Sequence, residues 1–205
     1  MTPDESALIG PSCFRGLYLD ENPLIRNTVF RDARAAQPDS GIPGFMITAE
    51  QIQIVDGTLK LMSETELLMA DFYRVCSKLW SDNAAFWEEI AQDEVRHSQI
   101  ILKMLELITA RPGQYTLYYD FKPAGIEGFS GYVRKMRDRA VAGEISQLNL
   151  LALLKDMERC MIEEKFFIIV TTSNPEYRRL VDGILEDTSV HKDKIGLRLL
   201  ELSQA

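Results

Sequence analysis

The sequence predicts an all-α protein, a four-helix bundle with a long crossover between the second and third helices. Three observations lead to this prediction. Apolar residues recur at steps of three and four through four long segments, which is the spacing of one helix face. Clusters containing proline, glycine, serine and asparagine separate these segments. Strand signals are scarce outside a tyrosine-rich connection.

The first quarter of the chain, residues 1–47, differs in composition from the rest. It holds five of the eight prolines together with several glycines, which is typical of an extended or loosely structured arm. We therefore expect an N-terminal arm at 1–47 and a bundle at 48–205.

The helices of the bundle have recognisable starts and stops. Thr48 is a good N-cap residue, and Glu50 and Gln51 follow it in the first turn. Arg111-Pro112-Gly113 ends the second helix, and Pro175 is suited to the first position of the fourth. The expected helices span residues 48–80, 83–110, 144–172 and 175–202, and the crossover at 111–143 is expected to hold a shorter helix at 132–141.

Composition and cysteine spacing exclude several classes of protein. A net charge of −8 argues against nucleic-acid binding and against an anionic membrane surface. No apolar run approaches the roughly 20 residues of a membrane span, and no signal peptide is evident. The three cysteines (Cys13, Cys76 and Cys160) form no Cys-x-x-Cys motif, which excludes zinc ribbons and rubredoxin-type iron sites and fits a reducing compartment. A cytoplasmic protein is expected.

A carboxylate and an imidazole interrupt the apolar stripe of the second helix. The stripe consists of Ile90, Glu94, His97, Ile101, Met104 and Ile108. Because the rest of this face is apolar, Glu94 and His97 should point into the core, where polar groups are costly unless they are satisfied. Glu-x-x-His facing inward from a helix is a recurring part of carboxylate-bridged di-metal sites.

The other helices carry inward polar residues of the same kinds. Helical periodicity places Glu66, Glu158 and His191 within the apolar faces of the first, third and fourth helices. Thr188 shares the face of His191, and Asp187 lies at its edge. At an offset of 94 residues, Glu94 and His97 align with Thr188 and His191, so the two halves of the bundle resemble an internal repeat.

Two interpretations explain this inward polar set. In the first, a bound cation offsets the cost of burying the charges, and oxygen and imidazole ligands together suit iron, manganese or zinc. In the second, the groups form a protonated or salt-bridged polar core, with Lys165 or Arg159 supplying positive charge. The candidate metal ligands are Glu66, Glu94, His97, Glu158 and His191, with Asp187 as a possible substitute for a missing carboxylate. Tyr73 lies on the same face as Glu66; it is expected mainly to pack in the core, and the alternative is a hydrogen bond near the site.

These residues resemble the rubrerythrin-like branch of the ferritin-like superfamily. The matching segments are Glu66-Leu-Leu-Met-Ala-Asp-Phe-Tyr73, Ile90-Ala-Gln-Asp-Glu-Val-Arg-His97, and Glu158 followed by Ile162-Glu163 and Phe166. The resemblance covers residues 48–203 and implies a ferritin-like bundle that binds two irons and acts in peroxide reduction or iron oxidation. A homodimer is expected by the same analogy.

Two departures from this family pattern bear on function. Thr188 stands where the second Glu-x-x-His motif of the family has its glutamate. Three outcomes remain open: a di-metal site completed by Asp187 or water, a site for one metal ion, or a degenerate site that binds no metal. The rubredoxin-like electron-transfer module is absent, so an enzyme of this kind needs an external electron donor. The alternatives are a non-catalytic helical scaffold or partner-binding protein and, with less support, a carboxylate-bridged oxygenase.

Overall fold

The computed structural model describes residues 47–117, 124–163 and 169–204. Five helices and a two-stranded ribbon account for nearly all of this part of the chain, so the predicted all-α class is confirmed at that level. The expected arm at 1–47 lies outside the described residues except for Ile47, which is buried.

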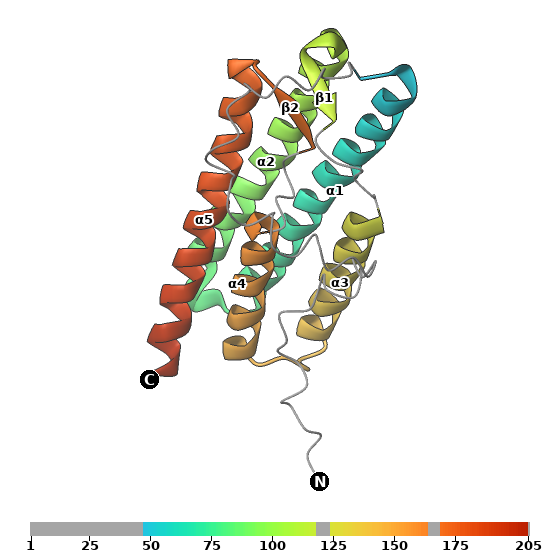
Figure 1. Cartoon of the computed structure of the whole chain (residues 1–205). Helices are drawn as coiled ribbons and strands as arrows, with labels where there is room; N and C mark the ends of the chain where they lie inside the picture. The colour runs from blue at the N-terminus through green and yellow to red at the C-terminus, as the bar shows by residue number, and fades with distance from the viewer. Residues whose placement is uncertain (1–46, 118–123, 164–168, 205) are drawn as a thin grey trace, which may run out of the picture.

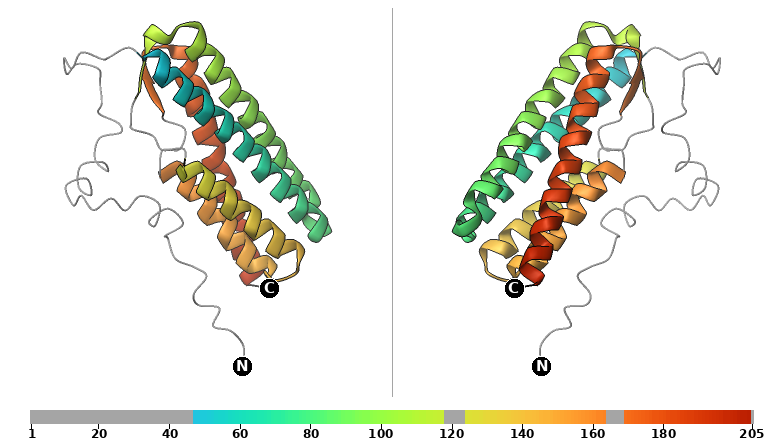
Figure 2. Two further views of the ribbon diagram at one scale, coloured as in Figure 1. Left: turned by 90° about the vertical axis from the view of Figure 1, so that its right-hand side faces the viewer. Right: turned by 90° about the vertical axis from the view of Figure 1, so that its left-hand side faces the viewer.

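Three long helices run the length of the molecule: α1 (Ala49–Leu79), α2 (Ala84–Ala110) and α5 (Pro175–Ser203). The shorter α3 (Ala124–Val141) and α4 (Gln147–Glu163) lie beside only one half of them (Figures 1 and 2). Helix α1 packs against both α2 and α3, while α5 packs against α4 and α2. Within the described residues, no helix is both long enough and apolar enough to cross a membrane.

Local signals in the sequence explain the ends of the long helices. Thr48 accepts a hydrogen bond from the Gln51 backbone N–H, and the Gln51 side chain accepts one from the Thr48 N–H, so α1 begins with a complete capping box. A short 3₁₀ turn, Ser81–Asn83, separates α1 from α2. The Asn174 side chain caps α5 by accepting from the Glu176 and Tyr177 N–H groups. These three helices therefore match the predicted ranges closely.

Helix α3 begins earlier than the predicted residues 132–141. Three glycines precede residue 132, and each disfavours a helix by about 1 kcal/mol relative to alanine. The buried stripe of Ile126, Phe129, Val133, Met136 and Ala140 outweighs that cost because it packs on the core. Gly143, with φ of 72°, then ends the helix in a left-handed conformation that other residues rarely adopt.

The prediction that one helix runs from 144 to 172 is wrong at its C-terminal end. Helix α4 is described as far as Glu163, residues 164–168 lie outside the described part of the chain, and Val170–Thr172 form β2, which pairs antiparallel with β1 (Tyr115–Leu117). Three β-branched residues in succession favour this extended pairing over a helix. The ribbon lies at one end of the bundle (Figure 1), where Asn174 donates a hydrogen bond to the Tyr115 hydroxyl.

Candidate metal centre

The five predicted inward residues are all buried. Their exposed fractions are at most 2%, and they come from four helices: Glu66 from α1, Glu94 and His97 from α2, Glu158 from α4, and His191 from α5. The apolar stripes of these helices form the surrounding core, including Met62, Ile90 and Ile184. Helical periodicity alone therefore predicted correctly which of these polar side chains point inward.

Two groups of potential ligands share one residue. Glu66, Glu94 and His97 offer ligand atoms that all lie within 4.8 Å of one another, and Glu94, Glu158 and His191 form a second group on the same criterion. Each group contains two carboxylates and one imidazole. Because Glu94 belongs to both, its carboxylate lies where it could bridge two ions.

The histidines turn the same ring nitrogen towards Glu94. His97 Nδ1 lies 2.9 Å from Glu94 Oε2, and His191 Nδ1 lies 3.0 Å from Glu94 Oε1. The second contact is off the line of a hydrogen bond, so His191 Nδ1 has no hydrogen-bond partner among the described residues. The ring centroids are 5.7 Å apart. The two imidazoles thus flank one carboxylate, with one oxygen of Glu94 facing each ring.

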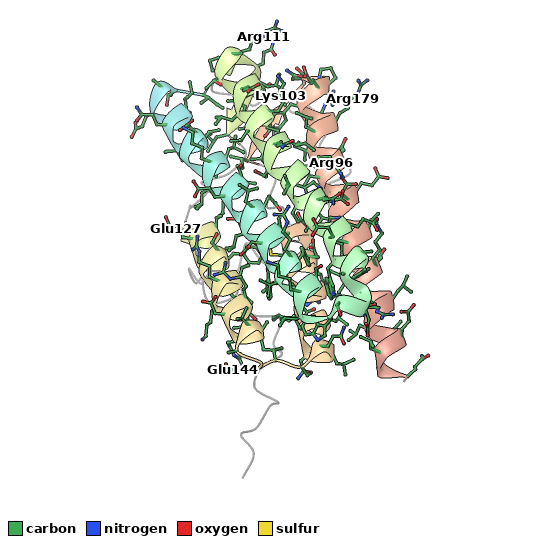
Figure 3. All side chains as sticks on the ribbon, turned by 180° about the vertical axis from the view of Figure 1, so that it is seen from behind. Arg96, Lys103, Arg111, Glu127, Glu144 and Arg179 are labelled. Carbon is green, nitrogen blue, oxygen red and sulfur yellow. The ribbon has the colours of Figure 1, made fainter. Side chains whose placement is uncertain are left out.

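The outer ring nitrogens contact carboxylates from the opposite helix. His191 Nε2 lies 3.0 Å from Asp93 Oδ2, and His97 Nε2 lies 3.3 Å from Asp187 Oδ2. Arg96 joins the two aspartates through its guanidinium, in the region between α2 and α5 where Figure 3 labels it. Such carboxylates fix the tautomer and orientation of a ligating histidine and raise its basicity.

Asp187, predicted as a possible metal ligand, lies outside both ligand groups and is 35% exposed. Its carboxylate faces the Nε2 side of His97, away from Glu94, and binds Arg96. Sequence reasoning missed the matching role of Asp93. The repeat offset of 94 residues contains the signal that could have found it, because Asp93 aligns with Asp187.

Among the candidate ligands, the Glu66 carboxylate has the fewest hydrogen-bond partners. Both of its carboxylate oxygens are buried and have no hydrogen-bond partner within the described residues. Burial, with the nearby charges of Glu94 and Glu158, raises the pKa of Glu66 well above its usual value. A carboxylate in this position needs either a proton or a cation.

Glu158 and Glu94 differ in pKa because their partners differ. Burial and the Glu94 charge raise the pKa of Glu158 to about 8. Burial opposes ionisation of Glu94 too, but its contacts with His191 and His97 outweigh that effect and lower its pKa to about 2. Burial lowers the pKa of His191, but contact with the Glu94 carboxylate outweighs that effect and raises the pKa of this imidazole to about 9. Contact with Glu94 likewise raises the pKa of His97 against the opposing effect of burial, so this one carboxylate favours the protonated form of both imidazoles.

Tyr73 contacts the centre directly, which is the second of the two roles that the sequence left open for it. Its hydroxyl donates a hydrogen bond to Glu158 Oε1, and the residue is fully buried. Thr188 is also buried, but its hydroxyl donates to the Ile184 carbonyl oxygen at 2.8 Å. The repeat position of Glu94 thus supplies no carboxylate, and the centre has three glutamates and two histidines.

Of the two residues proposed as counter-charges for the centre, Arg159 is described and pairs elsewhere. Arg159 is partly exposed and forms an ion pair with Asp156 at 3.1 Å, on the same helix. Lys165 lies outside the described residues.

Comparison with known proteins adds no further constraint: no protein-family model, curated protein or solved structure matches this chain.

Proposed function

We propose that this chain is a metal-binding, ferritin-like protein that holds iron between its helices at Glu66, Glu94, His97, Glu158 and His191. The observation that supports this most is the buried Glu66 carboxylate, which lacks a hydrogen-bond partner among the described residues. Removing a carboxylate from water costs several kcal/mol unless an opposite charge compensates. A cation bound by Glu66, Glu94 and His97 would supply that charge.

The donor set favours a transition metal over calcium or magnesium. Carboxylate oxygens combined with imidazole nitrogens suit iron, manganese and zinc, whereas calcium and magnesium take oxygen ligands almost exclusively. The sharing of Glu94 between two ligand groups supports a pair of ions. The absence of a carboxylate at Thr188 makes the second ion more weakly held, so one-metal occupancy is part of the proposal.

The proposed architecture is a ferritin-like bundle of α1, α2, α4 and α5, with α3 in the crossover. Its support is that each of these four helices contributes at least one buried candidate ligand. In the rubrerythrin-like branch, this arrangement implies redox chemistry with peroxide, dioxygen or ferrous iron. Iron would supply the redox chemistry, and the protein would set its geometry and solvent access.

Metal analysis with a matched pair of variants tests this proposal. Glu66→Gln changes a buried carboxylate, while Glu64→Gln makes the same change two residues away at an exposed position. Protein purified without added metal should contain up to about two irons per chain. Glu66→Gln should lower that number, and Glu64→Gln should leave it unchanged.

Proton release gives a second readout of the same site. Glu66, Glu158, His97 and His191 all have raised pKa values in the metal-free protein, yet metal ligands must be deprotonated. Ferrous iron added without oxygen should therefore release protons, which titration calorimetry in buffers of different ionisation enthalpy measures. Hydrogen peroxide should then oxidise the bound iron.

A non-catalytic helical scaffold is the second candidate, and the Thr188 side chain favours it. The Thr188 hydroxyl donates a hydrogen bond to the Ile184 carbonyl oxygen, so it does not require an ion as a partner. The scaffold reading predicts no metal in the purified protein, no proton release on adding iron, and a melting temperature that chelators do not change. Those results together would refute the metal-binding proposal.

A further inference from the structure

We propose that Tyr73, Trp87 and Trp80 form an electron relay between the buried metal centre and the end of the bundle where α1 meets α2. This inference rests on the proposed function, because it assumes an oxidising metal at Glu158. Through these side chains an external one-electron donor could reduce a centre whose ligands are almost entirely shielded from solvent.

The three aromatic side chains form a continuous series. The Tyr73 hydroxyl donates to Glu158, and the Tyr73 ring stacks on Trp87 with centroids 6.0 Å apart and planes inclined by 18°. The next pair, Trp87 and Trp80, has centroids 6.3 Å apart. Tyr73 and Trp87 are fully buried, while Trp80 is partly exposed at the C-terminal end of α1. The series therefore connects the centre to the surface.

The chemistry of these side chains suits electron transfer. Phenol and indole lose one electron far more readily than other aromatic side chains, and contact between rings allows rapid transfer. Phe86 also touches Trp87, with centroids 4.8 Å apart, but its ring is too hard to oxidise to take part. Phe86 is therefore a natural control for packing without redox activity.

The hydrogen bonds of Trp87 and Tyr73 differ in a way that matters for a relay. Trp87 Nε1 is buried and has no hydrogen-bond partner among the described residues. An oxidised Trp87 would then keep its N–H proton and return readily to the neutral indole. Tyr73 has an acceptor in Glu158, so its oxidation can proceed with transfer of the phenolic proton. Trp87 is suited to passing an electron on, and Tyr73 to exchanging one with the centre.

Electrons and protons are conserved at each step of the relay. Iron held at Glu158 would supply the oxidising equivalent; Tyr73 would give up one electron, and its phenolic proton would pass to Glu158. Trp87 gives one electron to Tyr73, which recovers its proton from Glu158. Trp80 then reduces the Trp87 radical cation, and an external one-electron donor reduces Trp80. The net transfer is one electron from that donor to the metal.

The first test uses the metal-free full-length chain, so it does not depend on metal binding. A photo-generated ruthenium(III) polypyridyl complex oxidises surface groups, and electron paramagnetic resonance detects the tyrosyl radicals that form. The Tyr73 radical is the part of the signal that Tyr73→Phe removes. We expect Trp80→Phe and Trp87→Phe to remove the same part, and Phe86→Leu to retain it.

The second test uses iron-loaded protein and a reductant too large to enter the core. Trp80→Phe and Trp87→Phe should slow re-reduction of the ferric protein without changing its iron content, whereas Phe86→Leu should not. Trp80 is partly exposed, so Trp80→Phe remains informative if Trp87→Phe unfolds the protein. A Tyr73 signal that persists in the folded Trp80→Phe protein overturns the relay. Absence of iron binding overturns the proposed function instead.

Discussion

Replacing Glu158 with glutamine keeps the shape of this side chain but removes its ability to ionise. The glutamine carbonyl can still accept the hydrogen bond that the Tyr73 hydroxyl donates. In the metal-free protein, Glu158 has a pKa of about 8, against 4.5 when exposed to water, because of its burial and the charge of Glu94. Glu158→Gln therefore isolates the cost of ionising this one buried carboxyl group.

The sign of the effect follows from the raised pKa. Below pH 4.5 the group is protonated in both folded and unfolded chains, and its contribution to stability is fully present. Between pH 4.5 and about 8, the unfolded chain loses this proton while the folded chain keeps it. The free energy of unfolding of the wild type then falls by about 1.4 kcal/mol per pH unit from this group, or by up to roughly 5 kcal/mol in total.

Urea denaturation of chelated protein across this pH range measures the effect. The stability of Glu158→Gln should fall less steeply than that of the wild type, so the variant should become the more stable protein near pH 8. Asp156→Asn on the same helix, where the aspartate is 39% exposed, should follow the wild type. With metal bound the order should reverse, because the variant has lost a ligand. Parallel profiles for the wild type and Glu158→Gln would refute this reasoning.

Three further substitutions test the centre and the core. Thr188→Glu places a carboxylate at the repeat position of Glu94, so it should strengthen binding of the second ion in metal titrations. Because the new carboxylate is buried, the variant should also lower the stability of the metal-free protein by several kcal/mol, as measured by urea denaturation. Asp93→Asn removes the charged acceptor of His191 Nε2 and should weaken metal binding roughly 10- to 100-fold, as measured by competition with a chelator. Ile90→Ala should cost about 2–5 kcal/mol of unfolding free energy because Ile90 is fully buried, as urea denaturation will show.

Each of these expectations has an outcome that would contradict it. Thr188→Glu with unchanged metal binding would show that residue 188 does not face the ions. Asp93→Asn with wild-type affinity would mean that the aspartate does not support the histidine. Ile54→Ala, at a position that is 44% exposed, is the control for Ile90→Ala and should change stability by less than about 0.5 kcal/mol. Equal losses at both positions would contradict the assigned core.

Where the helices begin and end could be predicted only where local chemistry decides it. Thr48 and Asn174 cap α1 and α5 through hydrogen bonds to residues two or three positions away, so their roles are visible in the sequence. The start of α3 depends on packing against α1 that outweighs three glycines, and Val170–Thr172 are extended because they pair with residues near 115. The start of this helix and the extended conformation of this strand both depend on residues distant in the sequence, so the local sequence pattern predicted them wrongly.

By itself, the sequence determined which polar side chains lie on the buried faces of the helices. A helical period of 3.6 residues fixes that direction locally, and Glu66, Glu94, His97, Glu158 and His191 are all buried as predicted. Only the tertiary structure decided how these groups meet: that Glu94 faces both imidazoles, that Tyr73 reaches Glu158, and that Asp187 lies on the outer side of His97. The physical reason is that hydrogen bonds and ligand distances between helices depend on how closely and at what height the helices pack, which no single helix encodes.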